Sequence, residues 1–297
     1  MLKILTITVG IPAYNEEKTI GKIIVKLKKM VDKIIVCDDG SSDMTSEIAE
    51  SLGAIVIKHQ KNTGYGAAIG SLFLKARELN SDVLITLDAD GQHRVEDVKS
   101  VLEPIISNSA DIVIGSRFLD KNQNIPSYRR AGIKAITRLA NTSLENKITD
   151  SQSGFRAYNR RVLDELNLSD YGMGVSSEIL IKASKKGFRI REVPIIVNYD
   201  GDTSTHHPLS HGISVILSTM KFISIEHPLK FYGIPGFTFL GIGLFFIVWT
   251  LQVFGESRQI ITNISLIGIG TTIFGTILIM TAIMLYSIIN VVREHKG

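Results

Sequence analysis

The sequence predicts an α/β fold with a mostly parallel sheet, followed by an amphipathic helix and two transmembrane helices. Three observations support this prediction. Short β-branched segments alternate with helical ones up to residue 115, an apolar stripe at helical spacing covers residues 211–226, and two long uncharged segments follow residue 230. Repeated strand–helix–strand units imply parallel strands that are covered by helices on both faces.

The prediction of a parallel sheet rests on the first half of the chain. Runs rich in β-branched residues predict strands at residues 4–11, 33–37, 54–58, 83–87 and 111–115. Helical periodicity predicts helices between them, at residues 16–30, 44–52, 66–79 and 95–107. Asn15 is the expected N-cap of the first of these helices.

After Gly115 the regular alternation ends. We expect a basic helix over 127–146, a compact polar and aromatic segment over 150–158, helices near 159–166 and 176–186, and a strand around 190–197. The cations of the basic helix could attract anionic lipid, and a solvated face is the alternative.

Two segments, residues 231–254 and 260–292, contain no charged residue. Each exceeds the roughly 20 residues that a helix needs to cross a bilayer. A very apolar core hairpin is the alternative. The stripe before them carries Ile213, Ile216, Leu217, Met220 and Ile223 on one face. It predicts a helix that lies in the membrane interface or packs against the preceding domain.

Flanking cations predict the orientation of the two spans. Lys221 and Lys230 precede the first span, and Arg293 and Lys296 follow the second. The positive-inside bias therefore predicts that both termini and the domain before the spans lie in the cytoplasm, in a multi-pass protein of the cell membrane. We expect three parts: a cytosolic domain at 1–209, a juxtamembrane helix at 210–228, and a transmembrane hairpin at 229–297 with a short cytosolic tail.

Polar clusters follow the first four predicted strands. These clusters are Asn15 and Glu16, Asp38 and Asp39, residues 61–66, and residues 88–93. In a parallel sheet the strand C-termini line one edge, where ligands bind. Each cluster alone could be a turn or a helix cap.

Two of these clusters suggest particular ligands. Asp88 and Asp90 flank one small residue, and such crowded carboxylates favour a hard cation, Mg²⁺ or Mn²⁺, that also binds a diphosphate. A solvated acidic turn is the alternative. Gly64-Tyr65-Gly66 with Gly70 resembles a dinucleotide loop, but residues 59–63 separate it from the strand end, which disfavours an NAD site.

Four motifs carry a family resemblance. They are Pro12-Ala13-Tyr14-Asn15-Glu16, Asp38-Asp39-Gly40-Ser41, Asp88-Ala89-Asp90 and Ser153-Gly154-Phe155-Arg156. In this order they resemble family 2 glycosyltransferases of GT-A fold, and more narrowly dolichyl-phosphate mannose and glucose synthases with their polyprenyl-phosphate relatives. The resemblance covers residues 4 to about 200, and it implies a nucleotide-sugar-binding domain.

The resemblance also implies roles for individual residues. The nucleotide would be bound by Pro12, Tyr14, Glu16 and Asp38, with Asp39, Lys61 and Ala89 close by. The metal and the diphosphate would be bound by Asp88, Asp90 and Gln92. The acceptor phosphate would be gripped by Arg117 and by Arg129 or Arg130. Asp150 would orient Arg156 or the phosphate, or act as a base.

The implied activity is metal-dependent, inverting transfer of a sugar from a nucleotide-diphosphate sugar to dolichyl or polyprenyl phosphate, which supplies a lipid-linked sugar for glycosylation. The 199–209 loop lacks the basic residue that mannose synthases carry near a Gly-x-Ser. UDP-glucose or UDP-N-acetylglucosamine is therefore favoured as the donor, with GDP-mannose as the alternative.

Other readings of the sequence fit less well. A processive polysaccharide synthase would show a Gln-x-x-Arg-Trp segment, but the sole tryptophan, Trp249, lies inside a span. The net charge of +4 does not indicate a nucleic-acid binder. A zinc site at His206, His207 and His211 would lack further ligands, so contact with lipid phosphate, or no contact, is the expectation for these histidines.

Overall fold

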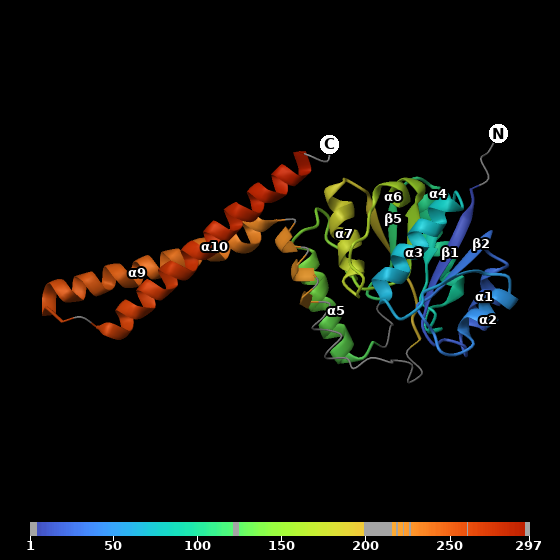
Figure 1. Ribbon diagram of the computed structural model, residues 1–297, viewed down its shortest axis with the longest axis horizontal. Coiled ribbons are helices and arrows are strands. Elements are labelled where there is room, and N and C mark those ends of the chain that lie inside the picture. Colours follow the sequence, from blue (N-terminus) through green and yellow to red (C-terminus); the bar gives the residue numbers. More distant parts are fainter. Residues whose placement is uncertain are drawn as a thin grey trace. The chain divides into compact units, whose positions relative to one another are not determined.

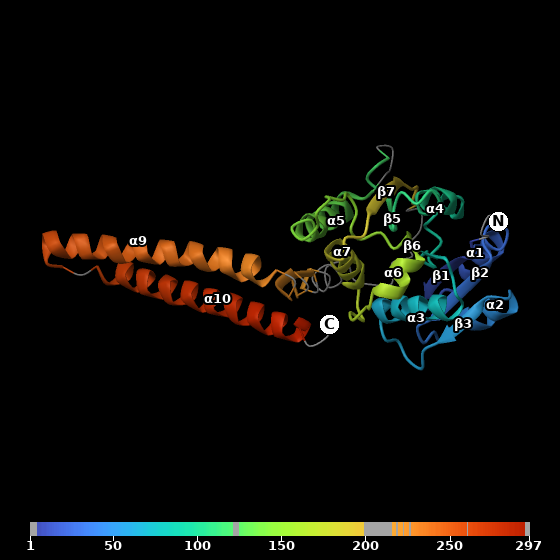
Figure 2. The ribbon, with the colours of Figure 1, turned by 90° about the horizontal axis from the view of Figure 1, so that it is seen from above.

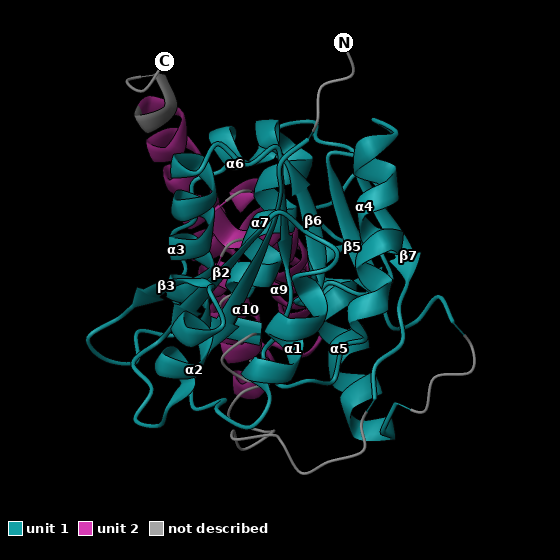
Figure 3. Cartoon of the chain, turned by 90° about the vertical axis from the view of Figure 1, so that its right-hand side faces the viewer, with its two compact units in different colours: residues 1–220 teal, residues 221–297 magenta. Residues whose placement is uncertain are grey.

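The computed structural model describes residues 5–120, 125–198 and 216–294, apart from residues 218, 222, 226 and 260. The chain divides into two units, residues 1–220 and residues 221–297 (Figure 3). The loop at 199–209, the three loop histidines and Ile213 lie outside the described residues. The predictions made for them, and the expected boundaries at 209 and 228, stay predictions.

A single sheet organises the first unit. Its strands are β1 (Ile7–Ala13), β2 (Lys33–Asp38), β3 (Ile55–Lys58), β4 (Val83–Thr86), β5 (Ile112–Ser116), β6 (Arg156–Asn159) and β7 (Ile190–Pro194). They lie in the order β3-β2-β1-β4-β6-β5-β7. Only β6 runs antiparallel to its neighbours among these described strands. The prediction of a mostly parallel α/β fold is therefore confirmed.

Helices cover both faces of this sheet (Figure 2). They are α1 (Ile20–Leu27), α2 (Thr45–Ser51), α3 (Tyr65–Glu78), α4 (Val98–Ile106), α5 (Ser127–Ala140), α6 (Arg160–Glu165) and α7 (Val175–Lys185). In β2, Ile34 and Val36 belong to the core formed with α1, α2 and α4, whereas Ile35 and Cys37 face α3, α6 and α7. Burial on both faces explains why the strands read as nearly continuous apolar runs.

Two local expectations were wrong, and one strand was not predicted. Residues 156–159, at the end of the predicted polar and aromatic segment, form strand β6. The basic helix ends at Ala140, because the Asn141 side chain then exchanges two hydrogen bonds with the backbone of Ile148. Asn15 does not cap α1; the N-cap position is Thr19, and the Asn15 side chain is used by a neighbouring loop.

The second unit is built mainly from two long helices, α9 (Ile234–Ser257) and α10 (Thr262–Glu294), after a short π-helical turn at Leu229–Gly233 (Figure 1). Both are long and apolar enough to cross a membrane. Few of their residues are buried, only 6% and 11% of the most apolar windows, which argues against the alternative of a soluble core hairpin.

Candidate active site

The sheet places two polar loops at the point where its topology changes direction. From β1 the chain moves outward to β2 and β3, whereas β4 lies on the opposite side of β1. Ligands of open α/β sheets bind at the carboxyl ends of the strands beside such a point. Glu16 follows β1, and Asp88 and Asp90 follow β4. The predicted convergence of these clusters is therefore observed.

The loops after β1 and β2 hold each other in place. Asn15 has a left-handed backbone conformation (φ +57°), its carboxamide oxygen accepts a bond from the Ser42 amide at 2.9 Å, and its own amide donates to Ser41 Oγ at 2.9 Å. The Glu16 amide donates to Thr45 Oγ1 at 2.8 Å. The motif around Asn15 thus fixes the position of Glu16.

The carboxylates after β2 are almost completely buried. Asp38 accepts bonds from the Ser41 amide and from the Ser46 hydroxyl. Asp39 accepts bonds from the amides of Thr63 and Gly64 at 2.9 and 2.8 Å. Both residues therefore order the surrounding loops, and a direct contact of either with a nucleotide stays a prediction.

The remaining predicted nucleotide contacts differ in exposure. Tyr14 and Lys61 are exposed, Pro12 is buried at the end of β1, and Ala89 is buried between the two acids of its motif. A nucleotide at this edge could therefore reach the first two side chains directly, whereas Pro12 and Ala89 could contribute only backbone atoms or shape.

Three carboxyl groups from two loops share one electrostatic environment. Burial and the negative charge of Asp88 both raise the pKa of Asp90. Burial also raises the pKa of Glu16, and the charges of Asp90 and Asp88 add to that rise. Such mutual repulsion shows that negative charge accumulates here, which is the condition under which a bound cation is most favourable.

Asp88 is held from two sides. Tyr65 donates its hydroxyl to Asp88 Oδ1 at 3.1 Å, and His93 Nε2 lies 3.4 Å from Asp88 Oδ2. Burial raises the pKa of Asp88, but His93, Tyr65 and the charge of Arg117 outweigh burial and lower it overall. Asp88 is therefore fixed as an anion.

Gly154 makes room for this carboxylate. A Cβ atom at Gly154 would lie 2.5 Å from Asp88 Oδ1 and 2.7 Å from the Tyr65 hydroxyl. The glycine of the Ser153-Gly154-Phe155-Arg156 motif therefore has a steric function, because any side chain here would displace Asp88.

The donor set fits a divalent cation. Asp88 and Asp90 offer carboxylate oxygens. Gln92 is the third predicted ligand, and its backbone amide donates to Asp90 Oδ1 at 3.0 Å. No cluster of three or more acidic, histidine or cysteine side chains suited to a metal occurs in the part of the chain that the structure describes. Mg²⁺ typically uses one or two carboxylates together with substrate phosphates, so a sparse set is consistent with this ion.

Arg117 is oriented by a buried salt bridge. Its Nε and Nη2 atoms donate to the two carboxylate oxygens of Asp150 at 2.7 and 2.8 Å. Burial raises the pKa of Asp150, but Arg117 outweighs burial and holds that pKa below its ordinary value. Glu192 on β7 accepts bonds from the amides of Thr149 and Asp150, which positions the Asp150 loop.

Arg156 does not have the expected partner. We expected Asp150 to orient Arg156 or the phosphate, or to act as a base. Asp150 binds Arg117 and not Arg156, whereas its roles toward the phosphate and as a base stay predictions. Arg156 is 1% exposed and donates to the carbonyl oxygens of Ser151, Ser153 and Ser176. Arg156 therefore stabilises the backbone of residues 151–153 and of Ser176 next to the site. The physical reason is that the antiparallel strand β6 begins at Arg156 and carries this side chain into the interior.

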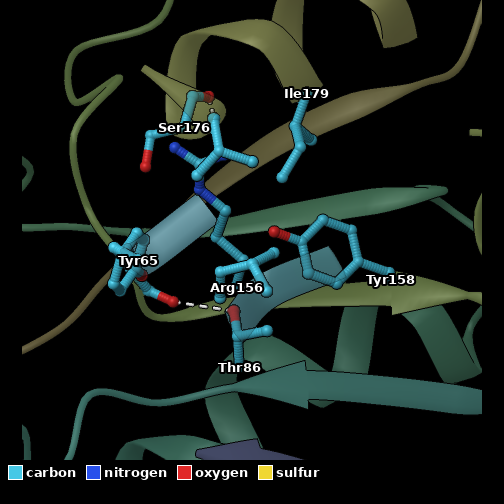
Figure 4. Close-up of a pocket in the computed structure, with 9 residues that line it drawn as sticks. Tyr65, Thr86, Arg156, Tyr158, Ser176 and Ile179 are labelled. Carbon is cyan, nitrogen blue, oxygen red and sulfur yellow. Dashed lines mark hydrogen bonds between the residues drawn. The ribbon is translucent and has the colours of Figure 1, made fainter. Parts of the chain in front are cut away.

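The space beside Arg156 is too small for a substrate. Figure 4 shows this cavity, which has a volume of about 10 Å³ and lies between Tyr65, Tyr158, Ser176 and Arg156. At its edge Thr86 Oγ1 donates to the Gly154 carbonyl at 2.7 Å. A volume of roughly 10–15 Å³ holds a single water molecule.

Arg129 and Arg130, the two candidates for the second acceptor-binding arginine, are adjacent on α5 but have different surroundings. The charge of Arg129 makes a minor contribution that lowers the pKa of Asp90, so Arg129 lies near enough to the acidic pair to act on it electrostatically. Arg130 instead lines a cavity of about 880 Å³ that also includes Arg117. The other cations in its lining are Lys134, Arg138 and Lys147, and we call this cavity the basic groove.

The sequence from residue 8 to residue 166, more than half of the chain, matches the family model described as glycosyl transferase family 2. The chain belongs to this family. The resemblance inferred from the four motifs, and the classification of the protein as a glycosyltransferase, are therefore confirmed.

Curated relatives of this family 2 glycosyltransferase include enzymes of archaea. A UDP-N-acetylglucosamine–dolichyl-phosphate N-acetylglucosaminyltransferase of Methanococcus voltae is 35% identical over 71% of the chain and 91% of that protein. A dolichyl-phosphate hexose transferase of Haloferax volcanii is 32% identical over 73% of the chain and 93% of that protein.

Among solved structures, glucosyl-3-phosphoglycerate synthase of Mycobacterium tuberculosis has the same fold. The TM-score is 0.58 at 23% identity, over 73% of this chain and 80% of that one. That enzyme was crystallised with Mn²⁺ and uridine diphosphate. The similarity supports the GT-A-type fold of the glycosyltransferase domain.

In this glycosyltransferase the glycine-rich segment at the N-terminal end of α3 has no backbone amide available for a phosphate at Gly66 and Ala67. The amides of Gly66 and Ala67 already donate to the Tyr171 carbonyl at 2.9 and 3.2 Å. A Cβ at Gly66 would lie 2.0 Å from the Asp170 carbonyl oxygen, so the glycine is needed for this close approach. A dinucleotide site at this helix end is therefore excluded.

Sequence reasoning missed two residues of the glycosyltransferase site. Tyr65 was part of an apparent dinucleotide loop, and Glu192 lay within a predicted strand. Neither belongs to one of the four family motifs, but both contact a predicted site residue: Tyr65 donates to Asp88, and Glu192 accepts from the Asp150 amide. Glu192 stands next to Arg191 in that strand, so the sequence offers no signal that singles it out.

Proposed function

We propose that this glycosyltransferase transfers glucose or N-acetylglucosamine from its UDP conjugate to dolichyl or polyprenyl phosphate, with inversion at the anomeric carbon. One juxtaposition carries the proposal. Arg117 acts electrostatically on Asp88, and Arg129 acts on Asp90. An acidic site for a metal–diphosphate therefore adjoins a basic site for a second anion.

An acceptor phosphate suits the chemistry of these residues. A hydroxyl acceptor needs a general base, whereas a phosphate monoester already carries a charge of about −1.5 to −2 near neutral pH. Asp150 is occupied by Arg117 on both oxygens, which suits an orienting residue better than a base. Arg117 and Arg130 would offset acceptor charge through the fork geometry of guanidinium groups.

The donor side would use the acidic pair. Asp88, Asp90 and Gln92 would hold Mg²⁺ or Mn²⁺ together with the diphosphate. A bound divalent ion supplies charge stabilisation to the departing nucleotide. Arg129 would add positive charge at the same end of the site. The relative named for UDP-N-acetylglucosamine supports a uridine nucleotide as the donor.

The two apolar helices suit a lipid-linked acceptor, because the prenyl tail of such an acceptor stays in the bilayer. We further propose that both termini and the glycosyltransferase domain lie in the cytoplasm, on the basis of the flanking cations. The lipid-linked sugar would then be supplied for glycosylation.

A transfer assay tests the proposed function. Membranes containing the protein are incubated with polyprenyl phosphate and radiolabelled UDP-glucose, UDP-N-acetylglucosamine or GDP-mannose, and label in the lipid phase is counted. We expect label from a UDP sugar, lost with EDTA and restored by Mg²⁺ or Mn²⁺. Asp90→Ala should abolish transfer, whereas Asp164→Ala, which removes an exposed carboxylate on α6, should not.

If label enters the lipid phase only from GDP-mannose, the donor is GDP-mannose and not a UDP sugar. Transfer that is unaffected by both EDTA and Asp90→Ala would contradict the metal-dependent reaction. Absence of lipid label from any donor, in membranes that contain the folded protein, would contradict the acceptor.

A further inference from the structure

The basic groove continues past the two arginines assigned to the acceptor. Lys134, Arg138 and Lys147 line its remaining part, and all three are exposed. Within the described residues, none of these three side chains forms an ion pair with a carboxylate. Among the described residues that line the groove, five are cations and one, Asp120, is an acid. Lys134, Arg138 and Lys147 therefore place positive charge along the groove that no carboxylate pairs with in the described part of the chain.

The spacing on α5 shows that one phosphate cannot occupy the whole groove. Arg130, Lys134 and Arg138 follow one another at intervals of four residues and so lie on one face of the helix. With a rise of 1.5 Å per residue, Arg130 and Arg138 are separated by about 12 Å along the axis. Like charges at this spacing disfavour a helix, and α5 carries no acidic residue to offset them.

We propose that Lys134, Arg138 and Lys147 bind the phosphate headgroup of an anionic phospholipid beside the acceptor. This inference rests on the proposed function, because an acceptor with a prenyl tail holds its phosphate at the level of the bilayer headgroups. A second lipid phosphate then lies within reach of a groove of this length. Polybasic surfaces attract anionic lipids in this way.

The groove also offers contact for the apolar part of a lipid. Phe118, Ile125 and Ile148 contribute to its lining. The Lys134 ammonium group lies 5.8 Å from the centre of the Phe118 ring, which brings a cation and an apolar surface together. A phospholipid presents this combination, a phosphate next to glycerol and acyl carbons, whereas free phosphate would use only the cations.

Lipid binding to the full-length protein tests the proposal. The protein in neutral detergent is titrated with phosphatidylglycerol, phosphatidylcholine or inorganic phosphate, and bound lipid is counted by native mass spectrometry. We expect saturable binding of phosphatidylglycerol only. The variant Lys134→Gln/Arg138→Gln/Lys147→Gln should bind it at least roughly tenfold more weakly, because each basic residue near anionic lipid contributes about fivefold.

A charge-matched control separates this site from general attraction. Lys22→Gln/Lys29→Gln/Lys99→Gln removes three exposed cations elsewhere on the domain and should keep full phosphatidylglycerol binding. Equal weakening in both triple variants would overturn the proposal. Phosphatidylglycerol that is displaced completely by polyprenyl phosphate would also overturn it, because both lipids would then share one site.

The same samples distinguish this inference from the proposed function. In neutral nanodiscs supplemented with phosphatidylglycerol, we expect sugar transfer by the wild type to rise, and the groove variant to lose that rise. Normal transfer without phosphatidylglycerol binding would refute the lipid site and leave the function intact. Binding without transfer from any donor would refute the function.

Discussion

The pairing of Arg117 with Asp150 is the contact that bears most directly on the proposed binding of an acceptor phosphate. Two hydrogen bonds fix the plane of the guanidinium group, and Asp150 is fully buried. Charge-assisted bonds of this kind are each worth about 1.5–3 kcal/mol. The orientation of Arg117, more than its mere presence, should therefore determine how well a phosphate binds.

Asp150→Asn is predicted to impair acceptor binding selectively. Asparagine keeps the shape of the side chain but removes its charge and one of its acceptor oxygens, so Arg117 loses its fixed orientation. We expect the KM for polyprenyl phosphate to rise roughly 10- to 100-fold, while the KM for the nucleotide sugar stays within about twofold. Steady-state kinetics with each substrate varied in turn measures both values. An unchanged acceptor KM would show that the salt bridge has no part in binding.

The loss of activity at acid pH is predicted to follow protonation of the acceptor phosphate. Because Arg117 lowers the pKa of Asp150, this carboxylate stays ionised as the pH falls to 5, and its contribution to stability is lost only below the ordinary carboxyl range. The second pKa of a phosphate monoester is about 6. The value of kcat/KM for the acceptor should therefore fall below pH about 6.

A phosphonate acceptor provides the control for this prediction. Its second pKa differs from that of the phosphate, so the acid limb of the pH–rate profile should move with the acceptor. A limb that stays in place with the phosphonate and disappears in Asp150→Asn would instead identify Asp150 as a general base.

At the scale of elements, glycines permit the close packing of α9 and α10. A Cβ at Gly243 would lie 2.2 Å from Thr272 Oγ1, and one at Gly275 would lie 2.5 Å from the Leu240 amide nitrogen. Small residues are typical of such contacts between membrane helices, because lipid provides no hydrophobic force to drive the helices together. The pair should therefore depend on these positions.

Gly243→Leu is predicted to destabilise the second unit, whereas Gly241→Leu should not. No heavy atom of a neighbouring element lies within 4 Å of a Cβ at Gly241. Overpacking costs about 1–3 kcal/mol, which corresponds to roughly 4–8 °C in Tm per kcal/mol for a unit as small as residues 221–297. Thermal unfolding in detergent compares the two variants. Equal Tm values would contradict the packing seen between α9 and α10.

At the scale of the whole molecule, the orientation in the membrane can be tested with the help of its only cysteine. Cys37 is fully buried, and burial together with the charge of Asp39 raises the pKa of its thiol to about 12. The native protein should therefore not react with maleimides, because the thiolate is the reactive form. Maleimide labelling of an engineered cysteine can then be measured without a background from Cys37.

Ser257→Cys, at the C-terminal end of α9, is predicted to react with a membrane-impermeant maleimide in intact cells. Ser100→Cys, an exposed position on α4, should react only after the membrane is permeabilised. This result follows if the basic flanks of the two spans face the cytoplasm. Labelling of Ser100→Cys in intact cells would reverse the proposed orientation.

The amino-acid sequence by itself determined the alternation of strands and helices, the two apolar spans and the family. These features depend on local periodicity, composition and short motifs, which can be recognised within one segment of the chain. It also indicated that Asp88 and Asp90 meet the loop after β1, because parallel strands end at a common edge.

Only the tertiary structure decided which side chains pair within the site. Asp150 binds Arg117 and not Arg156, and Glu192 supports Asp150 from a distant strand. Arg130 lines the basic groove, whereas the charge of Arg129 acts on Asp90. The antiparallel insertion of β6 between β4 and β5 causes much of this arrangement. Partners that lie tens of residues apart are selected by packing and register, and local patterns in the chain carry no information about either.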